Sequence, residues 1–468
     1  MPGRGAVADL AGADPSPYWL SQDGAPAPAD PLAGAETADL AVIGAGFSGL
    51  WTALLAKERD PDRDVVVLEA GTAGGAASGR NGGFCSASLT HGLANGLRHF
   101  PDEVDTLQRL GRANLDELAA AVDHYKINCD FARTGELSVA TADWQLRELT
   151  ASYTQARARG HDVHLLDRQE VRSEVDSPTY LGGLWDRSGC AMVDPARLVW
   201  GLRRVCLGLG VRVYENTPVE RITTAAGGLR LHAVGGRVVA DRVALAAGAH
   251  GGRLLRRLRH YVVPVYDYAL MTSPLTDAQL ASIGWGNRQG IGDAGNQFHY
   301  YRLTADNRIL WGGYDAVYYR GGRIRAEHDQ REATFQTLAA HFADTFPQLD
   351  GIRFTHKWGG VIDTCSRFSG FFGTTHGGRL AYAAGYTGLG VGASRFGAKV
   401  MLDLLSGART ELTALKMVRS KPMPFPPEPV RSGVIELTRW SIAQADRHEG
   451  HRNLWLRTLD RVGVGFDS

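Results

Sequence analysis

Several features that mark other classes of protein are scarce in this chain of 468 residues. The formal net charge is only +1, which argues against a nucleic-acid binder, because such proteins carry a clear excess of basic side chains. The five cysteines are widely spaced, with no C-x-x-C pair and no Cys/His cluster. We therefore expect no disulfide framework and no metal site, and the cysteines are typical of small buried side chains in a reducing compartment.

Long apolar runs are also missing. No segment reaches the length of a membrane span, and the N-terminus lacks a basic region followed by an apolar stretch. We therefore expect a cytoplasmic protein with no membrane segment. A composition of 44% hydrophobic and 22% charged residues is ordinary for a globular chain, and the length allows two or three domains.

A complete dinucleotide-binding unit stands near the start of the chain, at residues 37–70. An apolar strand runs into G-A-G-F-S-G, a helix follows, and a second strand ends in an acid. In this pattern Gly44 allows the tight turn, Gly46 lets the backbone approach a pyrophosphate, and Gly49 lets the helix pack on the strand. Glu69 stands where a carboxylate would accept hydrogen bonds from a ribose diol.

Three later glycine-rich segments suit a flat ligand as well. The loop S-G-R-N-G-G covers residues 78–83, a strand ends in L-A-A-G at 245–248, and another strand runs into G-Y-T-G-L-G at 385–390. Backbone with little side chain can pass close to a cofactor. A helix beginning near Val391 would aim its positive dipole end at the electron-accepting edge of a flavin.

The segment 260–356 is rich in aromatic residues, and its alternation in Q-F-H-Y-Y-R-L and R-I-L-W-G-G-Y predicts strands. One face of such a sheet would form a pocket wall. At the two ends of the chain, residues 1–35 are predicted to form an extended arm, and residues 411–468 a C-terminal arm with helices.

Together these motifs resemble the FAD-dependent amine and amino-acid oxidoreductases, the superfamily of D-amino-acid oxidase, glycine oxidase and monomeric sarcosine oxidase. The likeness is greatest to the gamma-glutamylputrescine oxidoreductase branch, through the G-R-N-G-G loop and the segment Y-Y-R followed by A-D-N-R at 300–308. The resemblance covers about residues 36–407.

This resemblance implies an α/β fold, with a Rossmann-like FAD-binding domain of the glutathione-reductase type and an inserted mixed-sheet α+β substrate domain. The FAD-binding domain would be noncontiguous, at 36–105, 190–258 and 357–410. The substrate domain would take 106–189 and 259–356, with the flavin ring between the two.

The resemblance also implies a set of FAD-binding residues, carried over motif by motif. They are Gly44, Gly46, Phe47, Ser48, Gly49, Glu69, Ala70, Ser78, Asn81, Gly82, Gly83, Val219, Gly248, Gly385, Tyr386, Thr387, Gly388 and Gly390. Some relatives attach flavin through a cysteine, but that position falls at the W-G-G glycines here and Cys365 lies several residues away, so we expect noncovalent FAD.

Function follows from what a flavin can do. We expect hydride transfer from the carbon beside an amine nitrogen, giving an imine that water hydrolyses to an aldehyde or keto product. The candidate substrate contacts are His299, Tyr301 and Trp358 near the reacting carbon and Arg302 as a carboxylate clamp. Strand alternation separates Arg302 from His299 and Tyr301, so the three cannot all face one way.

Other readings stay open at this stage. The same FAD frame could oxidise the C–O bond of a 2-hydroxy acid, or could serve a flavin-binding subunit that needs a partner. The sarcosine-oxidase type uses a lysine to activate oxygen, and this chain has no lysine between 127 and 356. Oxygen and another electron acceptor are therefore both open, as are the identity of the amine and a homo-oligomeric state.

Overall fold

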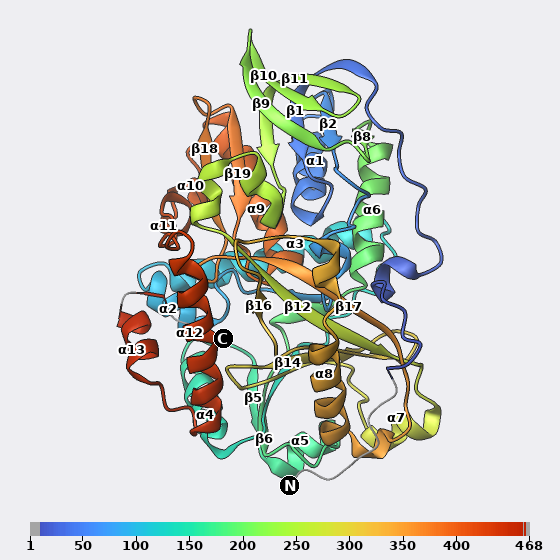
Figure 1. Cartoon of the computed structure of the whole chain (residues 1–468), viewed down its shortest axis with the longest axis vertical. Coiled ribbons are helices and arrows are strands. Elements are labelled where there is room, and N and C mark those ends of the chain that lie inside the picture. Colours follow the sequence, from blue (N-terminus) through green and yellow to red (C-terminus); the bar gives the residue numbers. More distant parts are fainter. Residues whose placement is uncertain (1–9, 462, 465–468) are drawn as a thin grey trace.

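The computed structural model describes residues 10–461 and 463–464, which build two sheets that meet around the middle of the molecule (Figure 1). The first sheet has eight strands and the second has nine. A small two-stranded ribbon, β3 (Phe84–Ser86) with β7 (Cys190–Met192), stands apart from both. No helix in the described part of the chain is long and apolar enough to cross a membrane.

The first sheet has the order β18-β19-β11-β1-β2-β8, with the hairpin β9–β10 attached to β11. Its central strands are parallel, with Ile43 opposite both Leu68 and Leu245. The strands are β1 (Gly34–Ile43), β2 (Val65–Leu68), β8 (Arg212–Tyr214), β9 (Val219–Ala225), β10 (Gly228–Ala233), β11 (Gly236–Leu245), β18 (Phe371–Thr375) and β19 (Leu380–Ala384).

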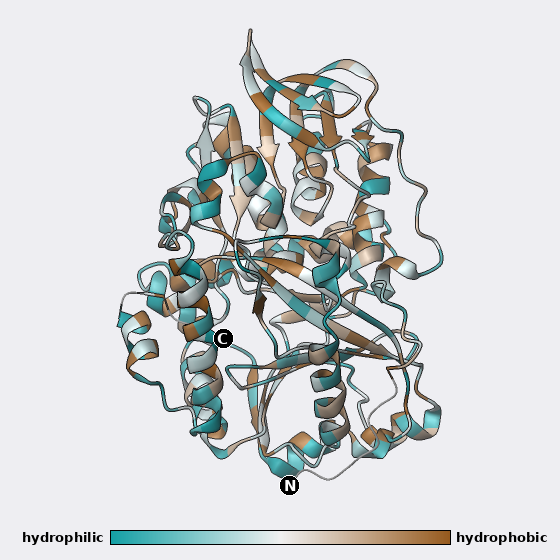
Figure 2. Cartoon of the chain, in the orientation of Figure 1, coloured by the Kyte–Doolittle hydropathy of each residue, from teal (hydrophilic) through white to brown (hydrophobic). Residues whose placement is uncertain are grey.

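Helices cover one face of this sheet, and Figure 2 shows the hydrophobic strands that they shield. The long helix α1 (Phe47–Arg59) packs between α6 (Pro195–Gly208) and α9 (Gly390–Ser406), and α3 (Val104–His124) lies against α9. α6 begins where the Asp194 side chain accepts from the Arg197 N–H, and Pro195 takes its first position. The expected Rossmann-like α/β architecture is confirmed.

The second sheet has the order β16-β12-β15-β14-β13-β4-β6-β5, with β17 paired to β12. It is antiparallel except for the pair β4 and β13. The strands are β4 (Glu136–Ala140), β5 (Val163–Leu166), β6 (Gly182–Asp186), β12 (Val263–Thr272), β13 (Gly290–Asp293), β14 (His299–Leu303), β15 (Ile309–Gly313), β16 (Val317–Tyr318) and β17 (Phe354–Thr364).

An aromatic core fills the face of the second sheet that lies under α8 (Glu332–Thr345). Phe335 and Phe342 of this helix pack against buried Tyr268 and Trp311. The opposite face borders a cavity. The other helices in these parts of the chain are α2 (Leu93–His99), α4 (Asp143–Arg157), α5 (Arg168–Glu174) and α7 (Asp277–Ile283).

The sequence-based boundary at residue 357 divides a strand. β17 pairs with β12 from Phe354 opposite Thr272 to Thr364 opposite Val263. This strand therefore belongs to the second sheet, and the chain crosses to the first sheet only after Thr364. The W-G-G segment lies inside this antiparallel ladder, opposite Ala269 to Asp267.

Both arms dock on the body. In the N-terminal arm Trp19 is buried, and its indole N–H donates to the carbonyl of Asn81 at 2.9 Å. After α10 (Glu411–Ala414) and α11 (Lys416–Arg419), the C-terminal arm forms α12 (Val430–Arg447) and α13 (Leu454–Arg461). In Figure 1 α12 runs along the flank of the second sheet.

Candidate active site

One large cavity of about 1680 Å³ lies between the two sheets. Its lining comes from the β1–α1 turn, the loop 69–82, strands β12, β14 and β17, the loop before α9, and α12. Pockets for single drug-sized ligands usually measure about 300–1,000 Å³. This cavity therefore has room for a large cofactor and a substrate together.

The β1–α1 turn lines one end of the cavity and needs glycine. Gly44 has φ +107°, a backbone conformation that side-chain-bearing residues rarely adopt. A Cβ on Gly49 would overlap the carbonyl oxygen of Gly44, so only glycine lets α1 approach the turn. The start of α1 thereby borders the cavity, and the N-terminus of a helix is a favourable place for an anion.

Glu69 follows β2 and holds this turn. One carboxylate oxygen accepts from the Ala45 N–H at 2.7 Å and the other from the Gly71 N–H at 2.9 Å. Burial raises the pKa of Glu69, and these backbone hydrogen bonds oppose the rise. The carboxylate lines the cavity beside Ala70 and the glycine-rich turn between β1 and α1.

The loop 78–83 lies beside the turn and is fixed by its own side chains. The Ser78 hydroxyl accepts from the Phe47 N–H at 3.0 Å, and the Asn81 side chain donates to the carbonyl of Ser78 and accepts from the Gly83 N–H. Gly82 lies against the ring of Tyr300, where a Cβ would come within 2.7 Å. Backbone and a tyrosine thus meet at the cavity wall.

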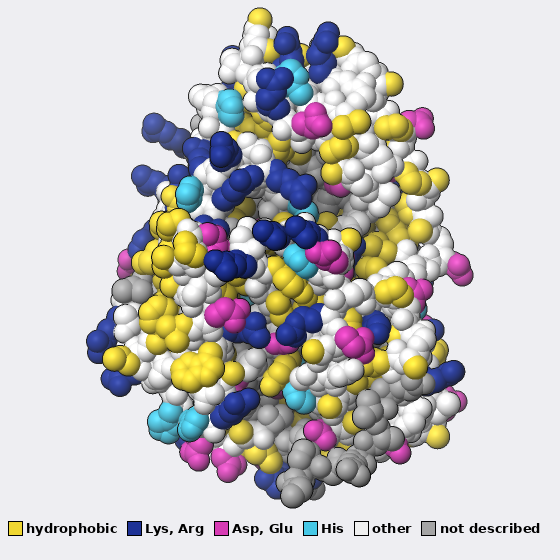
Figure 3. All heavy atoms as spheres, in the orientation of Figure 1, with side chains coloured by type: hydrophobic (Ala, Val, Ile, Leu, Met, Phe, Trp, Pro, Cys, Tyr) yellow, Lys and Arg dark blue, Asp and Glu magenta, His cyan; other side chains and the backbone are white. Residues whose placement is uncertain are grey.

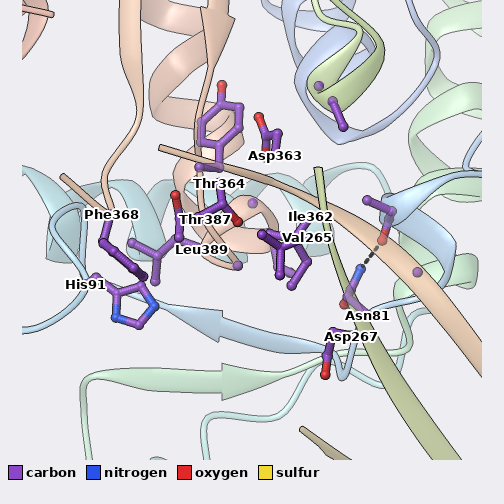
Figure 4. A pocket seen from close by; sticks show the side chains of 18 of the residues that line it. Asn81, His91, Val265, Asp267, Ile362, Asp363, Thr364, Phe368, Thr387 and Leu389 are labelled. Atoms are coloured by element: carbon purple, nitrogen blue, oxygen red, sulfur yellow. Dashed lines mark hydrogen bonds between the residues drawn. The ribbon is translucent and has the colours of Figure 1, made fainter. Parts of the chain in front are cut away.

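Asp363 organises the loop before α9. Its carboxylate accepts from the Gly385 N–H at 2.7 Å, and the Thr387 N–H donates to its backbone carbonyl. Thr387 has φ +50° and Gly388 has φ +89°. Figure 4 shows Asp363, Thr387 and Leu389 around the same space as Asn81 and Asp267. The N-terminus of α9 opens on this space.

Most of the expected cofactor residues line the cavity. These are Gly44, Gly46, Phe47, Ser48, Glu69, Ala70, Ser78, Asn81, Gly82, Val219, Gly248, Tyr386, Thr387, Gly388 and Gly390. Gly49, Gly83 and Gly385 lie behind it. A Cβ on Gly83 would meet the carbonyl of Val193, and one on Gly385 would meet Cys365 and Phe371, so these three shape the wall from the protein side.

The structure does not bring the four expected substrate contacts to one place. Trp358 lines the cavity, and its indole N–H donates to the carbonyl of Arg80 at 2.9 Å. His299 and Tyr301 instead face the aromatic core, as strand alternation in β14 requires once Tyr300 faces the cavity. Neither is among the residues that line the cavity, and both pack against Trp311 in the aromatic core.

The partners of these buried side chains show how they are used. His299 donates from Nδ1 to Asp293 at 2.7 Å, and the Tyr301 hydroxyl is 2.6 Å from that of Tyr180. Arg302 is on the same side of β14 as Tyr300, but its Nη1 donates to the carbonyl of Val193 at 2.6 Å, away from the cavity. The expected carboxylate clamp is a buried structural arginine.

A different pair from the second sheet faces the cavity, Asp267 of β12 and Tyr300 of β14. The Tyr300 hydroxyl donates to Oδ2 of Asp267 at 2.6 Å. Burial raises the pKa of Asp267 to about 6, although Tyr300 and two backbone N–H groups donate to its carboxylate. No Lys, Arg or His forms an ion pair with Asp267 among residues 10–461, and His299 lowers the pKa of this carboxyl only through space.

Asp267 was not among the site residues predicted from the sequence, although the sequence carries a signal for it. It is the single acid in V-P-V-Y-D-Y-A-L, a strand otherwise apolar or aromatic. A lone acid in such a run costs free energy if it is buried unpaired, which makes it a signal for a functional group. Tyr300 was missed because the sequence does not show whether Tyr300 or Tyr301 faces the cavity.

The comparison with family models decides the family. Residues 39–404 match the model described as FAD dependent oxidoreductase. The chain belongs to this family. It is 30% identical over 419 residues to gamma-glutamylputrescine oxidoreductase of Escherichia coli K12, covering 87% of this chain and 93% of that protein. It is also 27% identical to a probable oxidoreductase OrdL of Haemophilus influenzae, over 81% and 85% of the two chains.

Solved structures show the same fold. The crystal structure of glycine oxidase from Geobacillus kaustophilus superposes with a TM-score of 0.69 at 22% identity, over 82% of this chain and 99% of that one. L-proline dehydrogenase from P. horikoshii gives a TM-score of 0.67 at 16% identity, over 81% and 95%. The family match and the similarity to gamma-glutamylputrescine oxidoreductase show that the protein is an FAD-dependent oxidoreductase, as the resemblance implied.

The cavity fits this cofactor. Glycines leave the β1–α1 turn without side chains where a diphosphate needs backbone N–H groups. At the opposite end, added Cβ atoms on Gly388 and Gly390 would meet nothing within 4 Å, so the loop before α9 faces open space. A long flat cofactor can thus run from the turn, past the loop 78–83, to this second helix start.

Proposed function

We propose that this enzyme oxidises the C–N bond of a cationic amine, and that Asp267 and Tyr300 hold the reacting nitrogen. The observation that carries the proposal is the cavity-lining carboxylate of Asp267, which accepts from Tyr300 and contacts no basic side chain of the described residues. A buried anion of this kind is complementary to an ammonium group.

The same geometry disfavours a carboxylate next to the reacting carbon. Such a substrate would need a guanidinium close to Asp267 and Tyr300, and the Arg302 guanidinium donates to Val193 instead. Arg112, Arg253, Arg325 and Arg439 also line the cavity, but none of them is hydrogen-bonded to Asp267 or Tyr300 in the described chain. Arg80 does line the cavity, but it is paired with Asp329 at 2.5 Å. A 2-hydroxy acid would also place its anion near Asp267, and like charges repel at short range.

The enzyme must make the amine lone pair available. An alkyl ammonium of pKa about 10.4 and an ordinary aspartate differ by roughly 6.5 pKa units, or about 9 kcal/mol for direct proton transfer. Raising the pKa of Asp267 from 3.8 to about 6 lowers that difference by about 3 kcal/mol. Asp267 is thus a better proton acceptor than an exposed aspartate, and still ionised at neutral pH.

Aromatic side chains around Asp267 and Tyr300 lower the remaining difference in pKa between the substrate ammonium and Asp267. Trp358, Tyr300, Tyr266, Phe298 and Tyr314 all line the cavity. Excluding water from an ammonium lowers its pKa, because the charged form loses more hydration than the neutral amine. The proton passes from the substrate nitrogen to Asp267 while the Tyr300 hydroxyl keeps the carboxylate in place.

When bound, FAD supplies the acceptor for the hydride that leaves the carbon beside the nitrogen. The substrate becomes an imine, which water hydrolyses to a carbonyl compound and an amine or ammonia. We propose that Gly44, Gly46, Phe47 and Ser48 hold the diphosphate, that Glu69 holds the adenosine ribose, and that Asn81, Gly82, Thr387 and Gly388 border the ring.

The relatives support a C–N substrate. Gamma-glutamylputrescine oxidoreductase and glycine oxidase are named for amine-containing substrates. The experiment is anaerobic mixing of the purified holoprotein with polyamines, N-methyl amines, amino acids and 2-hydroxy acids, following flavin absorbance. Bleaching by amines that lack an α-carboxylate supports the proposal, and bleaching by hydroxy acids alone contradicts it.

A further inference from the structure

Helix α12 forms a wall of the cavity, although it lies beyond residue 404, where the match to the family model ends. Val434, Ile435, Thr438 and Ile442 line the cavity from one side of the helix. On its other side Leu437 and Trp440 are 42% and 57% exposed. Figure 3 shows apolar side chains on the outer surface in the region of α12.

Polar anchors fix both ends of α12 to loops of the second sheet. Near its C-terminus, the Asp446 carboxylate accepts from the Asn296 and Gln297 N–H groups and from the Asn296 side chain, at 2.7–3.0 Å. Just before its N-terminus, the Glu428 carboxylate accepts from the Tyr318 hydroxyl at 2.6 Å and from the Gly321 N–H. The middle of the helix is thereby held over the cavity.

The cavity side of α12 offers apolar contact and no free charge. Arg439 is the one charged residue of α12 that lines the cavity, and it forms ion pairs with Asp315 and Glu436, each at 3.6 Å. Ile435 and Ile442 border open volume, where an apolar surface gains free energy if a ligand displaces water from it. The wall is continuous with the space around Asp267 and Tyr300.

We propose that α12 determines substrate specificity by binding an alkyl chain attached to the reacting amine. The inference rests on the proposed function, in which Asp267 and Tyr300 hold the nitrogen. It assigns the substrate class as amines that carry several methylenes beyond that nitrogen. Short amines would fill the Asp267 end and leave the α12 wall in contact with water.

The test uses n-propylamine, n-butylamine, n-pentylamine and n-hexylamine with the holoprotein. The second-order rate constant for anaerobic flavin reduction is measured for each. Burial of one methylene contributes about 0.8 kcal/mol, which corresponds to a gain of about four-fold per carbon. Ile435→Asn should lower this gain to less than two-fold, and Leu437→Asn, on the exposed side of the same helix, should keep it.

Ile435→Ala serves as a milder variant if Ile435→Asn does not fold, and it should also lower the gain per carbon. Retained flavin colour and thermal melting show that a variant is folded. If the wild type is reduced by these amines with no dependence on chain length, or if Ile435→Asn and Leu437→Asn behave alike, the inference about α12 is overturned and the amine proposal stands. If no amine in this series or in the polyamine panel reduces the flavin, both fail.

Discussion

Tyr300 and Asp267 form a hydrogen bond across a strand that separates them. Tyr300 is on β14 and Asp267 on β12, and β15 lies between. The intervening residue opposite Tyr300 is Gly312, where a Cβ would come within 2.6 Å of the phenol ring. The absence of a side chain at Gly312 lets the tyrosine cross β15 and reach the carboxylate.

Replacing Gly312 should therefore break the pair without touching either member. Gly312→Ala is expected to push the Tyr300 ring away from Asp267 and to slow amine-driven flavin reduction about ten-fold or more, with FAD still bound. Stopped-flow reduction of the holoprotein gives the rate. An unchanged rate in a variant whose FAD spectrum is normal would show that the hydrogen bond is unimportant for reduction.

Two adjacent tyrosines on β14 make a matched comparison. Tyr300→Phe removes the hydroxyl that donates to Asp267, whereas Tyr301→Phe removes one that contacts Tyr180 in the core. We expect Tyr300→Phe to raise the kinetic pKa of Asp267, since it loses a hydrogen bond to the charged form. Tyr301→Phe should leave the pH profile unchanged and cost about 1 kcal/mol of stability. Equal pH profiles for the two variants would contradict the assignment.

Asp267→Asn should remove the negative charge that holds the ammonium. Reduction of the flavin by amines is expected to fall by roughly 10²–10⁴-fold, the usual size of a positioned acid–base contribution. Because Asp267 has a pKa of about 6 and acts as the carboxylate, the wild-type rate should decline as the pH falls through about 6. Asp267→Asn should not show this decline in rate. A decline near pH 6 in the variant would mean that another group titrates there.

Gly46 faces the cavity at the start of α1, and a Cβ there would lie within 2.7 Å of the Ser78 hydroxyl. Gly46→Val should give a folded but colourless protein, because the side chain fills the approach to the diphosphate. Gly208→Ala, at the end of α6 with nothing within 4 Å, should remain yellow. A normal flavin content in Gly46→Val would remove the turn from the FAD site.

The raised pKa of Glu136 gives a prediction for how the free energy of unfolding depends on pH. It lines the cavity on β4, and burial, together with Asp186 beside it, raises its pKa to about 7. A carboxyl group with a raised pKa in the folded state stabilises the fold at low pH, and this contribution is lost as the pH rises from about 4.5 through 7. Glu136→Gln should therefore be more stable than wild type at pH 8, by on the order of 2 kcal/mol.

The measurement for Glu136 is denaturant unfolding of apoprotein at pH 4.5 and pH 8. The difference in the free energy of unfolding between the variant and the wild type should grow with pH. Other buried carboxyl groups, including Asp363 with a pKa of about 6, contribute to both proteins and cancel in that difference. A constant difference would mean that Glu136 titrates as an exposed acid.

Features that require close approach of the backbone could be predicted from the sequence, whereas features that depend on strand pairing could not. The turn from Gly44 to Gly49 and the acid at Glu69 were found because close backbone approach permits only glycine, and such positions are visible in a sequence. The fold class followed from them. The expected domain boundary at residue 357 falls inside β17, and the pairing of this strand with β12 on both sides of that residue appears only in the folded chain.

The substrate side was harder to predict for a different reason. In β14 the phase of the alternation decides whether Tyr300 or Tyr301 faces the cavity, and both faces of the strand are buried. No pattern of polar and apolar residues could set that phase. The role of α12 was equally hidden, since only the folded chain brings Ile435 and Ile442 to the cavity.

The central claim is that the reacting group is an amine held by Asp267, and the pH dependence of flavin reduction tests it most directly. The second-order rate constant is measured anaerobically with two amines of different pKa. For both amines the rate constant should rise as the pH passes about 6, where Asp267 ionises. It should rise again at higher pH, at a position that follows the pKa of each amine, because the neutral amine reacts. At saturating amine, where the rate reports the bound complex, Trp358→Ala should raise the pKa of the bound amine by readmitting water. An upper rise at the same pH for both amines, or reduction by hydroxy acids alone, would contradict the account.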